Sequence, residues 1–104
     1  MSNDISLTVR IPKDLNTELT KLAKELGVTK VNLLRFAIHL FLSEKPTELT
    51  FPDTSSEDRF RFVFNTNQVT YNLLVKASEK YDQPINSILN SISVLALEHY
   101  SKYL

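Results

Sequence analysis

The segment Leu33–Leu42 is apolar on nearly every side, and this limits what the 104-residue chain can fold into. Eight of its ten residues are apolar, and only Arg35 and His39 interrupt the run. The segment is too short to span a bilayer and follows Thr29, a favoured helix N-cap, so it predicts a buried helix that extends to about Glu44. Such a helix must be surrounded, and one strand plus one further helix are too few to surround it.

A strand and a helix precede this segment. Ile5–Ile11 alternates apolar and polar residues, which predicts a strand with one buried face. After Pro12, leucines recur at helical spacing as far as Leu26, and Gly27 is expected to end that helix in the left-handed conformation. Residues 5–44 are therefore predicted to form a strand–helix–helix unit that lacks a closed core of its own.

A second unit of the same kind follows over residues 59–100. Arg59–Asn65 alternates like the first strand and places three phenylalanines on one face, which we expect to lie in the core. Helices are predicted from about Gln68 to Tyr81 and from Pro84 to about Tyr100, with Asp82 at the position that Gly27 occupies in the first unit. An internal repeat is therefore indicated by the order of the elements and their periods.

The two units align with an offset of 55 residues and no gap, although only five of the 37 aligned pairs are identical. Residues 45–58 between them have the composition of a linker, within which 48–51 alternates briefly as a short extra strand would. We predict one domain over residues 1–104, mainly α with a short antiparallel β-ribbon. In it the strands 5–11 and 59–65 pair within the chain as an intramolecular pseudo-dimer; the competing arrangement pairs the 5–11 strands of two chains.

The composition excludes several kinds of site. The sequence has no cysteine, one glycine and two histidines, which excludes thiolate zinc sites, cysteine nucleophiles and glycine-rich phosphate loops. We expect no catalytic residues, no metal, no cofactor and no association with membranes. Twelve basic and twelve acidic residues give zero net charge, so binding to nucleic acid would have to come from a local surface. The N-terminus lacks the pattern of a signal peptide, and we expect a cytoplasmic protein.

Three stretches of the first unit resemble the ribbon-helix-helix family of DNA-binding proteins, which includes the Arc and MetJ repressors. They are L-T-V-R-I-P-K-D-L (7–15), L-A-K-E-L-G-V-T (22–29) and L-L-R-F-A-I (33–38). The second unit is a degenerate match. The resemblance implies that two strands form one ribbon for the major groove and that four helices cover its back, so that the fold is a tandem ribbon-helix-helix.

The resemblance also implies which residues contact DNA. The base contacts would come from the polar face of each strand: Ser6, Thr8, Arg10, Arg61, Val63 and Asn65. Thr29 and Lys30, at the start of the second helix, match the family's phosphate contact. In the second unit Pro84 and Ile85 stand at the corresponding positions. Proline has no amide hydrogen and isoleucine has no charge, and both properties disfavour a second phosphate contact.

These expectations leave two functions open. The first is sequence-specific binding of double-stranded DNA by a transcriptional regulator, a repressor by its resemblance, with self-association on the DNA. The second is a protein-interaction module of antitoxin type, which uses the same fold as a dimerisation platform and binds a protein partner.

Overall fold

The structure, a computed structural model, describes residues 4–51 and 58–104. It contains a two-stranded antiparallel ribbon that pairs β1 (Ile5–Pro12) with β2 (Arg59–Thr66) of the same chain. Two helices follow each strand: α1 (Lys13–Leu26) and α2 (Lys30–His39), then α3 (Gln68–Tyr81) and α4 (Ile85–Tyr100). The fold is therefore mainly helical with a short β-ribbon, as predicted, and the two strands pair within the chain.

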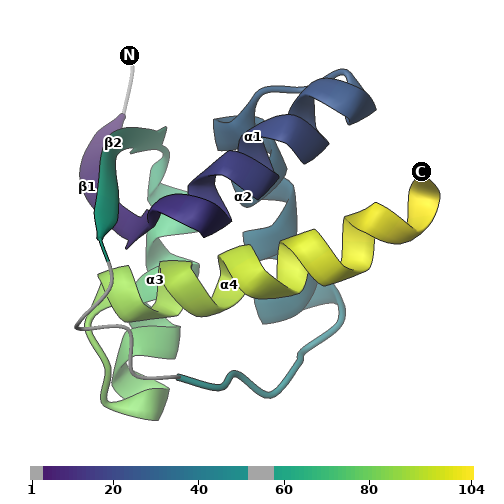
Figure 1. The fold of residues 1–104 in the computed structure, drawn as a ribbon. Helices are drawn as coiled ribbons and strands as arrows, with labels where there is room; N and C mark the ends of the chain where they lie inside the picture. The colour runs from purple at the N-terminus through teal and green to yellow at the C-terminus, as the bar shows by residue number, and fades with distance from the viewer. Residues whose placement is uncertain (1–3, 52–57) are drawn as a thin grey trace.

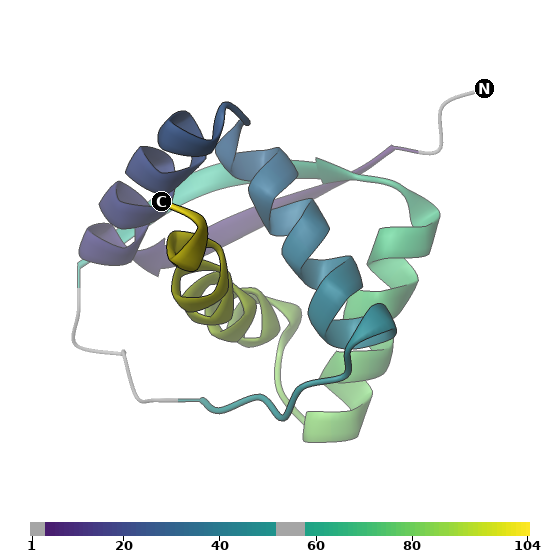
Figure 2. The same ribbon diagram turned by 90° about the vertical axis from the view of Figure 1, so that its right-hand side faces the viewer.

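All four helices lie on one side of the ribbon and leave its other side uncovered (Figures 1 and 2). α1 and α3 lie toward opposite ends of the ribbon, while α2 and α4 lie between them and pack against each other. Val9, Ile11 and Phe64, which point from the strands toward the helices, are fully buried. The ribbon thus has one face in the core and one face outside it.

Each first helix ends at a residue in the left-handed conformation. Gly27 follows α1 with φ of 77°, and Asp82 follows α3 with φ of 52°. Glycine adopts this conformation without strain, and aspartate is one of the few other residues that visit it, so both predicted stops are confirmed. Thr29 then begins α2 as predicted, since its hydroxyl accepts the amide of Asn32 at 3.1 Å.

The apolar segment is helical throughout, but its last turn is wider than an α-helix. α2 ends at His39 and continues as a π-helical turn over Leu40–Glu44, closed by the Lys45 amide, which donates to the Leu40 carbonyl at 2.6 Å. Helical structure therefore reaches Glu44, as expected. His39 is half-buried, and its Nε2 lies 2.8 Å from the hydroxyl of Thr70, which joins α2 to α3.

The chain after α2 packs against the helices. Residues 48–51, whose brief alternation resembles that of a strand, form no strand. Leu49 is buried and its amide donates to the Tyr81 hydroxyl at 3.2 Å, while the Phe51 ring meets the Tyr81 ring edge to face. Residues 52–57 of the predicted linker lie outside the described part of the chain.

One hydrophobic core fills the space between the helices and the ribbon. α2 and α4 contribute its largest share through the following buried side chains: Leu33, Leu34, Ala37, Ile38, Ile88, Leu89, Ile92 and Ala96. Leu19 of α1 and Leu74 of α3 complete it from the two ends. Because both halves contribute to the same core, neither is closed without the other.

The phenylalanine row of β2 lies only partly in this core: the prediction is confirmed for Phe64, Phe62 packs at the edge of the core, and Phe60 corrects the prediction. Phe64 is fully buried, Phe62 is half-buried, and Phe60 keeps 39% of its surface exposed. The alternation identified the face that these rings share. It could not indicate that the core covers this face at Phe64 and leaves it open at Phe60.

Within residues 4–51 and 58–104, no single helix is long and apolar enough to cross a membrane. α1 and α2 reach that length only as a pair, and the chain bends by 91° between them. The apolar surface of α2 packs against α4.

Truncating either central leucine should destabilise the whole molecule. We expect Leu34→Ala and Leu89→Ala each to lower the free energy of unfolding by about 2–5 kcal/mol, since both side chains are fully buried. Val69→Ala is the control, because Val69 is 64% exposed. Chemical denaturation followed by circular dichroism and by tyrosine fluorescence should give one coincident transition. Two separate transitions would contradict the shared core.

Candidate nucleic-acid interface

The uncovered side of the ribbon, here called the outer face, carries every predicted base-contact residue. Its side chains are those that alternate away from the helices: Ser6, Thr8, Arg10, Arg59, Arg61, Val63 and Asn65. All of them are exposed, and Val63 keeps 54% of its surface accessible although it is apolar. The alternation in the sequence therefore identified a real surface that both strands share.

The register of the ribbon decides which of these residues are neighbours. Arg10 lies opposite Arg61, Thr8 opposite Val63, and Ser6 opposite Asn65. A hydrogen bond of 2.8 Å from the Ser6 hydroxyl to Asn65 Oδ1 joins the last pair. Sequence alternation assigns residues to faces but does not fix these pairs.

The two arginines form a close pair across the strands. The Arg10 amide and carbonyl point away from β2 and bond to side chains of α4, so Arg10 and Arg61 belong to a pair without backbone hydrogen bonds between them. Such pairs bring Cα atoms to about 4.5 Å and side chains closer than the alternate pairs do. Like charges directly opposite each other destabilise a ribbon.

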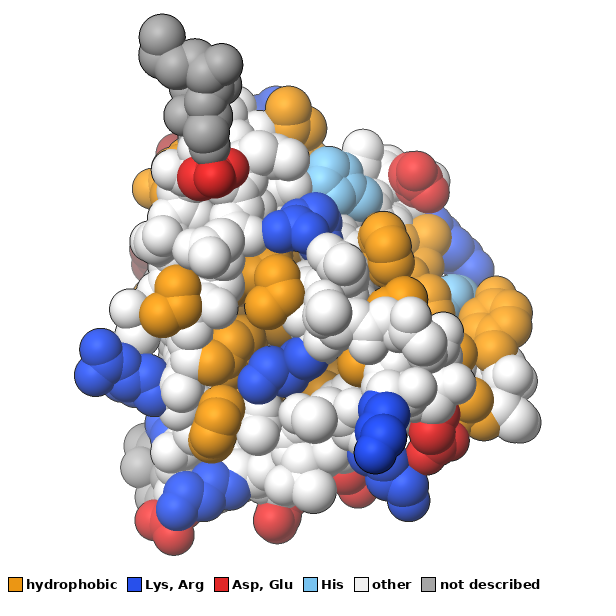
Figure 3. All heavy atoms as spheres, turned by 90° about the horizontal axis from the view of Figure 1, so that it is seen from above, with side chains coloured by type: hydrophobic (Ala, Val, Ile, Leu, Met, Phe, Trp, Pro, Cys, Tyr) orange, Lys and Arg blue, Asp and Glu red, His pale blue; other side chains and the backbone are white. Residues whose placement is uncertain are grey.

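The charge of the ribbon has one sign. Arg10, Arg59 and Arg61 are the charged residues within 5–12 and 59–66. Figure 3 views the molecule from above, with the ribbon along one side, and there lysine and arginine side chains lie among hydrophobic ones. A chain of zero net charge therefore has a locally basic surface at its ribbon.

Two asparagines of α4 hold the backbone of β1 from behind. Asn86 Oδ1 accepts the Arg10 amide at 2.8 Å, and the side-chain amides of Asn86 and Asn90 donate to the Arg10 carbonyl at 3.1 and 2.9 Å. On α2, Arg35 donates to the Asn65 carbonyl at 2.6 Å and holds β2 in the same way. These bonds fix both strands on the helices, and the sequence analysis did not identify their roles.

A pattern in the sequence does mark the two asparagines. They are the two amide side chains of α4 and are four residues apart, which places them on the same helical face. They bond to the backbone amide and carbonyl of a strand residue, and every residue type except proline carries both groups. Composition and spacing therefore give no hint of which residue the asparagines hold.

Lys30, at the start of α2, lies over the open end of the phenylalanine row. Its ammonium is 3.7 Å from the centroid of the Phe62 ring and 4.8 Å from that of Phe60, and it donates to Asn16 Oδ1 at 2.6 Å. Burial among these groups lowers the pKa of Lys30. An ammonium has three N–H donors, so contact with Asn16 leaves donors for a phosphate.

The starts of α2 and α4 differ as the sequence suggests. Thr29 is exposed and caps α2 with its hydroxyl, whereas Pro84 begins α4 without a side-chain cap. Both first carbonyls accept helix amides, since Thr29 accepts the amide of Leu33 at 2.9 Å and Pro84 accepts that of Ile88 at 3.2 Å. The two helix starts are therefore not equivalent as phosphate sites.

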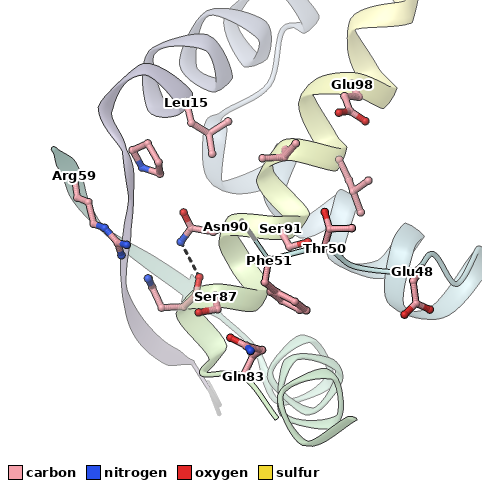
Figure 4. Close-up of a pocket in the computed structure, with 14 residues that line it drawn as sticks. Leu15, Glu48, Thr50, Phe51, Arg59, Gln83, Ser87, Asn90, Ser91 and Glu98 are labelled. Atoms are coloured by element: carbon pink, nitrogen blue, oxygen red, sulfur yellow. Dashed lines mark hydrogen bonds between the residues drawn. The ribbon is translucent and has the colours of Figure 1, made fainter. Parts of the chain in front are cut away.

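A pocket of about 590 Å³ lies along α4 (Figure 4). Asn86 and Asn90 line it together with Arg59, Leu15 and Phe51. Asn90 Oδ1 is buried and has no hydrogen-bond partner among the residues that the structure describes. Two of the residues that line the pocket, Asn86 and Asn90, also bind the Arg10 backbone. A displacement of these side chains would therefore alter the position of β1.

Comparisons with protein-family models, with curated proteins and with solved structures give no significant match to this chain. The residues of the outer face therefore carry the functional argument.

Removing the asparagine that binds the Arg10 amide should loosen the ribbon. We expect Asn86→Ala to lower the free energy of unfolding by about 1–3 kcal/mol, because the Arg10 amide loses its acceptor. The control is Asn72→Ala on α3, an exposed asparagine whose side chain bonds to Gln68, with an expected change within about 0.5 kcal/mol. Equal effects of both substitutions in urea denaturation would contradict the role of Asn86.

Proposed function

We propose that this chain binds double-stranded DNA sequence-specifically, with the outer face of its β1–β2 ribbon in the major groove, and acts as a transcriptional regulator of the repressor type. The observation that carries the proposal is the Arg10–Arg61 pair on an uncovered ribbon face. Like charges opposite each other cost roughly 0.2–1 kcal/mol in a free ribbon. An anionic partner at this face is attracted by both guanidinium groups, and this attraction offsets the repulsion between them.

The chemistry of the face fits base edges. Arginine donates two parallel hydrogen bonds to O6 and N7 of guanine, which is the commonest specific contact in the major groove. Thr8 and the exposed Val63 offer methyl groups for the methyl of thymine, and Ser6 and Asn65 offer hydrogen bonds. A face meant only for solvent needs neither an exposed valine nor paired arginines.

The dimensions of the ribbon also fit. Its two strands lie about 4.8 Å apart, and a major groove about 12 Å wide admits a two-stranded ribbon. The helices all lie on the opposite side, so they do not obstruct entry into the groove (Figures 1 and 2).

We also propose that the two strand–helix–helix units form an intramolecular pseudo-dimer of the ribbon-helix-helix kind. The 55-residue offset relates the starts of α1 and α3, the starts of α2 and α4, and the left-handed residues Gly27 and Asp82. It also relates Thr8 to Val63, which lie opposite each other, as residues on a two-fold axis must. The same offset relates Arg35 to Asn90, and each donates to the strand of the other unit at equivalent carbonyls.

A protein-interaction module of antitoxin type is the competing function. It would use the ribbon and helices as a dimerisation platform and would place no demand on the charge of the outer face. The paired arginines therefore favour DNA, and the effect of removing one of them separates the two functions.

Removing one arginine of the pair should improve stability and impair binding. We expect Arg61→Gln to raise the free energy of unfolding by about 0.2–1 kcal/mol at low salt and to weaken binding to the preferred duplex by about 1–3 kcal/mol. The control is Lys76→Gln, at an exposed lysine of α3 away from the ribbon, which should change neither quantity. Urea denaturation and fluorescence polarisation with duplexes selected from a random pool measure the two effects.

Unchanged duplex binding in Arg61→Gln would contradict the proposal. If the same variant also lost a protein contact, the interaction module would be the better explanation of the outer face.

Lys30 should contribute to binding without contributing to base preference. Lys30→Ala is expected to weaken specific and random duplexes alike and to lower the slope of log K against log salt by about one unit, because the residue can reach only the DNA backbone. Arg10→Ala should instead relax the preference at one position. Titrations at two or more salt concentrations measure the slope, and a loss confined to the preferred duplex would contradict this role of Lys30.

A further inference from the structure

We propose that the ribbon reads an asymmetric site in one fixed orientation, with guanines under the Arg10–Arg61 end and little base discrimination under the Ser6–Asn65 end. This inference rests on the proposed DNA binding and adds to it the direction and composition of the site. It follows from how the register distributes the side chains of two diverged halves.

A two-fold axis through Thr8 and Val63 exchanges the ends of the ribbon. By the 55-residue offset, the counterpart of Arg10 is Asn65, and the counterpart of Arg61 is Ser6. Neither arginine therefore has an arginine as its counterpart at the opposite end. In a symmetric ribbon an arginine pair at one end would be repeated at the other, whereas here both arginines lie at the same end.

The two ends differ in hydrogen-bonding chemistry as well as in charge. At one end two guanidinium groups lie opposite each other, with Arg59 one pair further along. At the other end the Ser6 hydroxyl already donates to Asn65 Oδ1, the atom with which an asparagine would accept from adenine. Strong readout is therefore concentrated in one half of the outer face.

The flanking charges reinforce this polarity. Lys30 lies over Phe60 and Phe62, whose strand partners Ile11 and Val9 flank Arg10. The counterpart of Lys30 is Ile85, which carries no charge. The arginine end thus has a cation for the DNA backbone that the opposite end lacks at the equivalent position.

The cation at the opposite end is already engaged. Arg35 donates to the Asn65 carbonyl at 2.6 Å and to Asn32 Oδ1 at 2.5 Å, so its guanidinium holds the strand. Asp4, an exposed acidic residue, directly precedes β1 at this end. The outer face is therefore basic at one end and nearly neutral at the other.

The spacing sets the size of the expected site. From Ser6 to Arg10 is four residues, about 13 Å along a strand, which corresponds to about four base-pair steps of 3.4 Å. We therefore expect two guanines at one end of the preferred site and a tolerant position about four base pairs away. Replacing the guanines should weaken binding about 10-fold or more each, and replacing the tolerant base pair should weaken it less than 3-fold.

A variant that restores symmetry tests the inference directly. Arg61→Ser together with Asn65→Arg gives both halves the polar pattern of β1, with one arginine at each end. Selection from random duplexes by the wild-type chain should return an asymmetric site, and selection by this double variant should return a site with guanine at both ends. If the wild-type chain selected a palindrome, or if both proteins selected the same site, the inference would be overturned.

Cleavage mapping gives the orientation independently of base preference. The chain has no cysteine, so Lys13→Cys and Gln68→Cys each provide one attachment point for a DNA-cleaving iron chelate. These exposed residues are counterparts at the starts of α1 and α3, next to opposite ends of the ribbon. We expect the chelate at 13 to cleave beside the guanines and the chelate at 68 to cleave beyond the tolerant end.

The outcomes separate the two proposals. Cleavage at both ends of the site from either position would overturn the fixed orientation and leave DNA binding intact. Failure of the unmodified chain to select any duplex, including a preference for RNA alone, would overturn the proposed function and the inference with it.

Discussion

Burial of α2 against α4 is the interaction on which the rest of this structure depends. α2 is apolar over most of its surface, and it can leave water only if a second helix of similar character covers it. α4 comes from the other half of the chain, so this packing makes two weak units into one domain. The ribbon is carried on this helix pair, and Asn90 and Arg35 fix the strands to it by hydrogen bonds to their backbone.

Because the helices support the ribbon from one side only, its outer face takes no part in the packing of the core. All four helices lie behind the strands, and the outer face contacts none of the core. Residues on such a face are free to diverge without loss of the fold. Like charges directly opposite each other disfavour a ribbon, and a local cost without local compensation is typical of a functional surface.

Two halves within one chain have a consequence that two identical chains lack. In a homodimer each substitution on the ribbon appears twice, at both ends. In a single chain a substitution in one half has no copy in the other half. Because the strands are antiparallel, such a substitution changes only one end of the ribbon. In the proposed pseudo-dimer this accounts for both arginines lying at one end and Ser6 and Asn65 at the other, and for Lys30 standing where the other half has Ile85.

The elements, the faces of the strands and the need for two units in one core follow from the amino-acid sequence, because periodicity and capping are local properties of the chain. The register, which places Arg10 opposite Arg61, emerges only from the packing of the folded chain. The same packing sets how far the core extends along the ribbon, so that Phe64 is buried while Phe60 lies open beneath Lys30. Alternation with a period of two assigns a side chain to a face, but its neighbours on that face depend on packing between segments more than 50 residues apart.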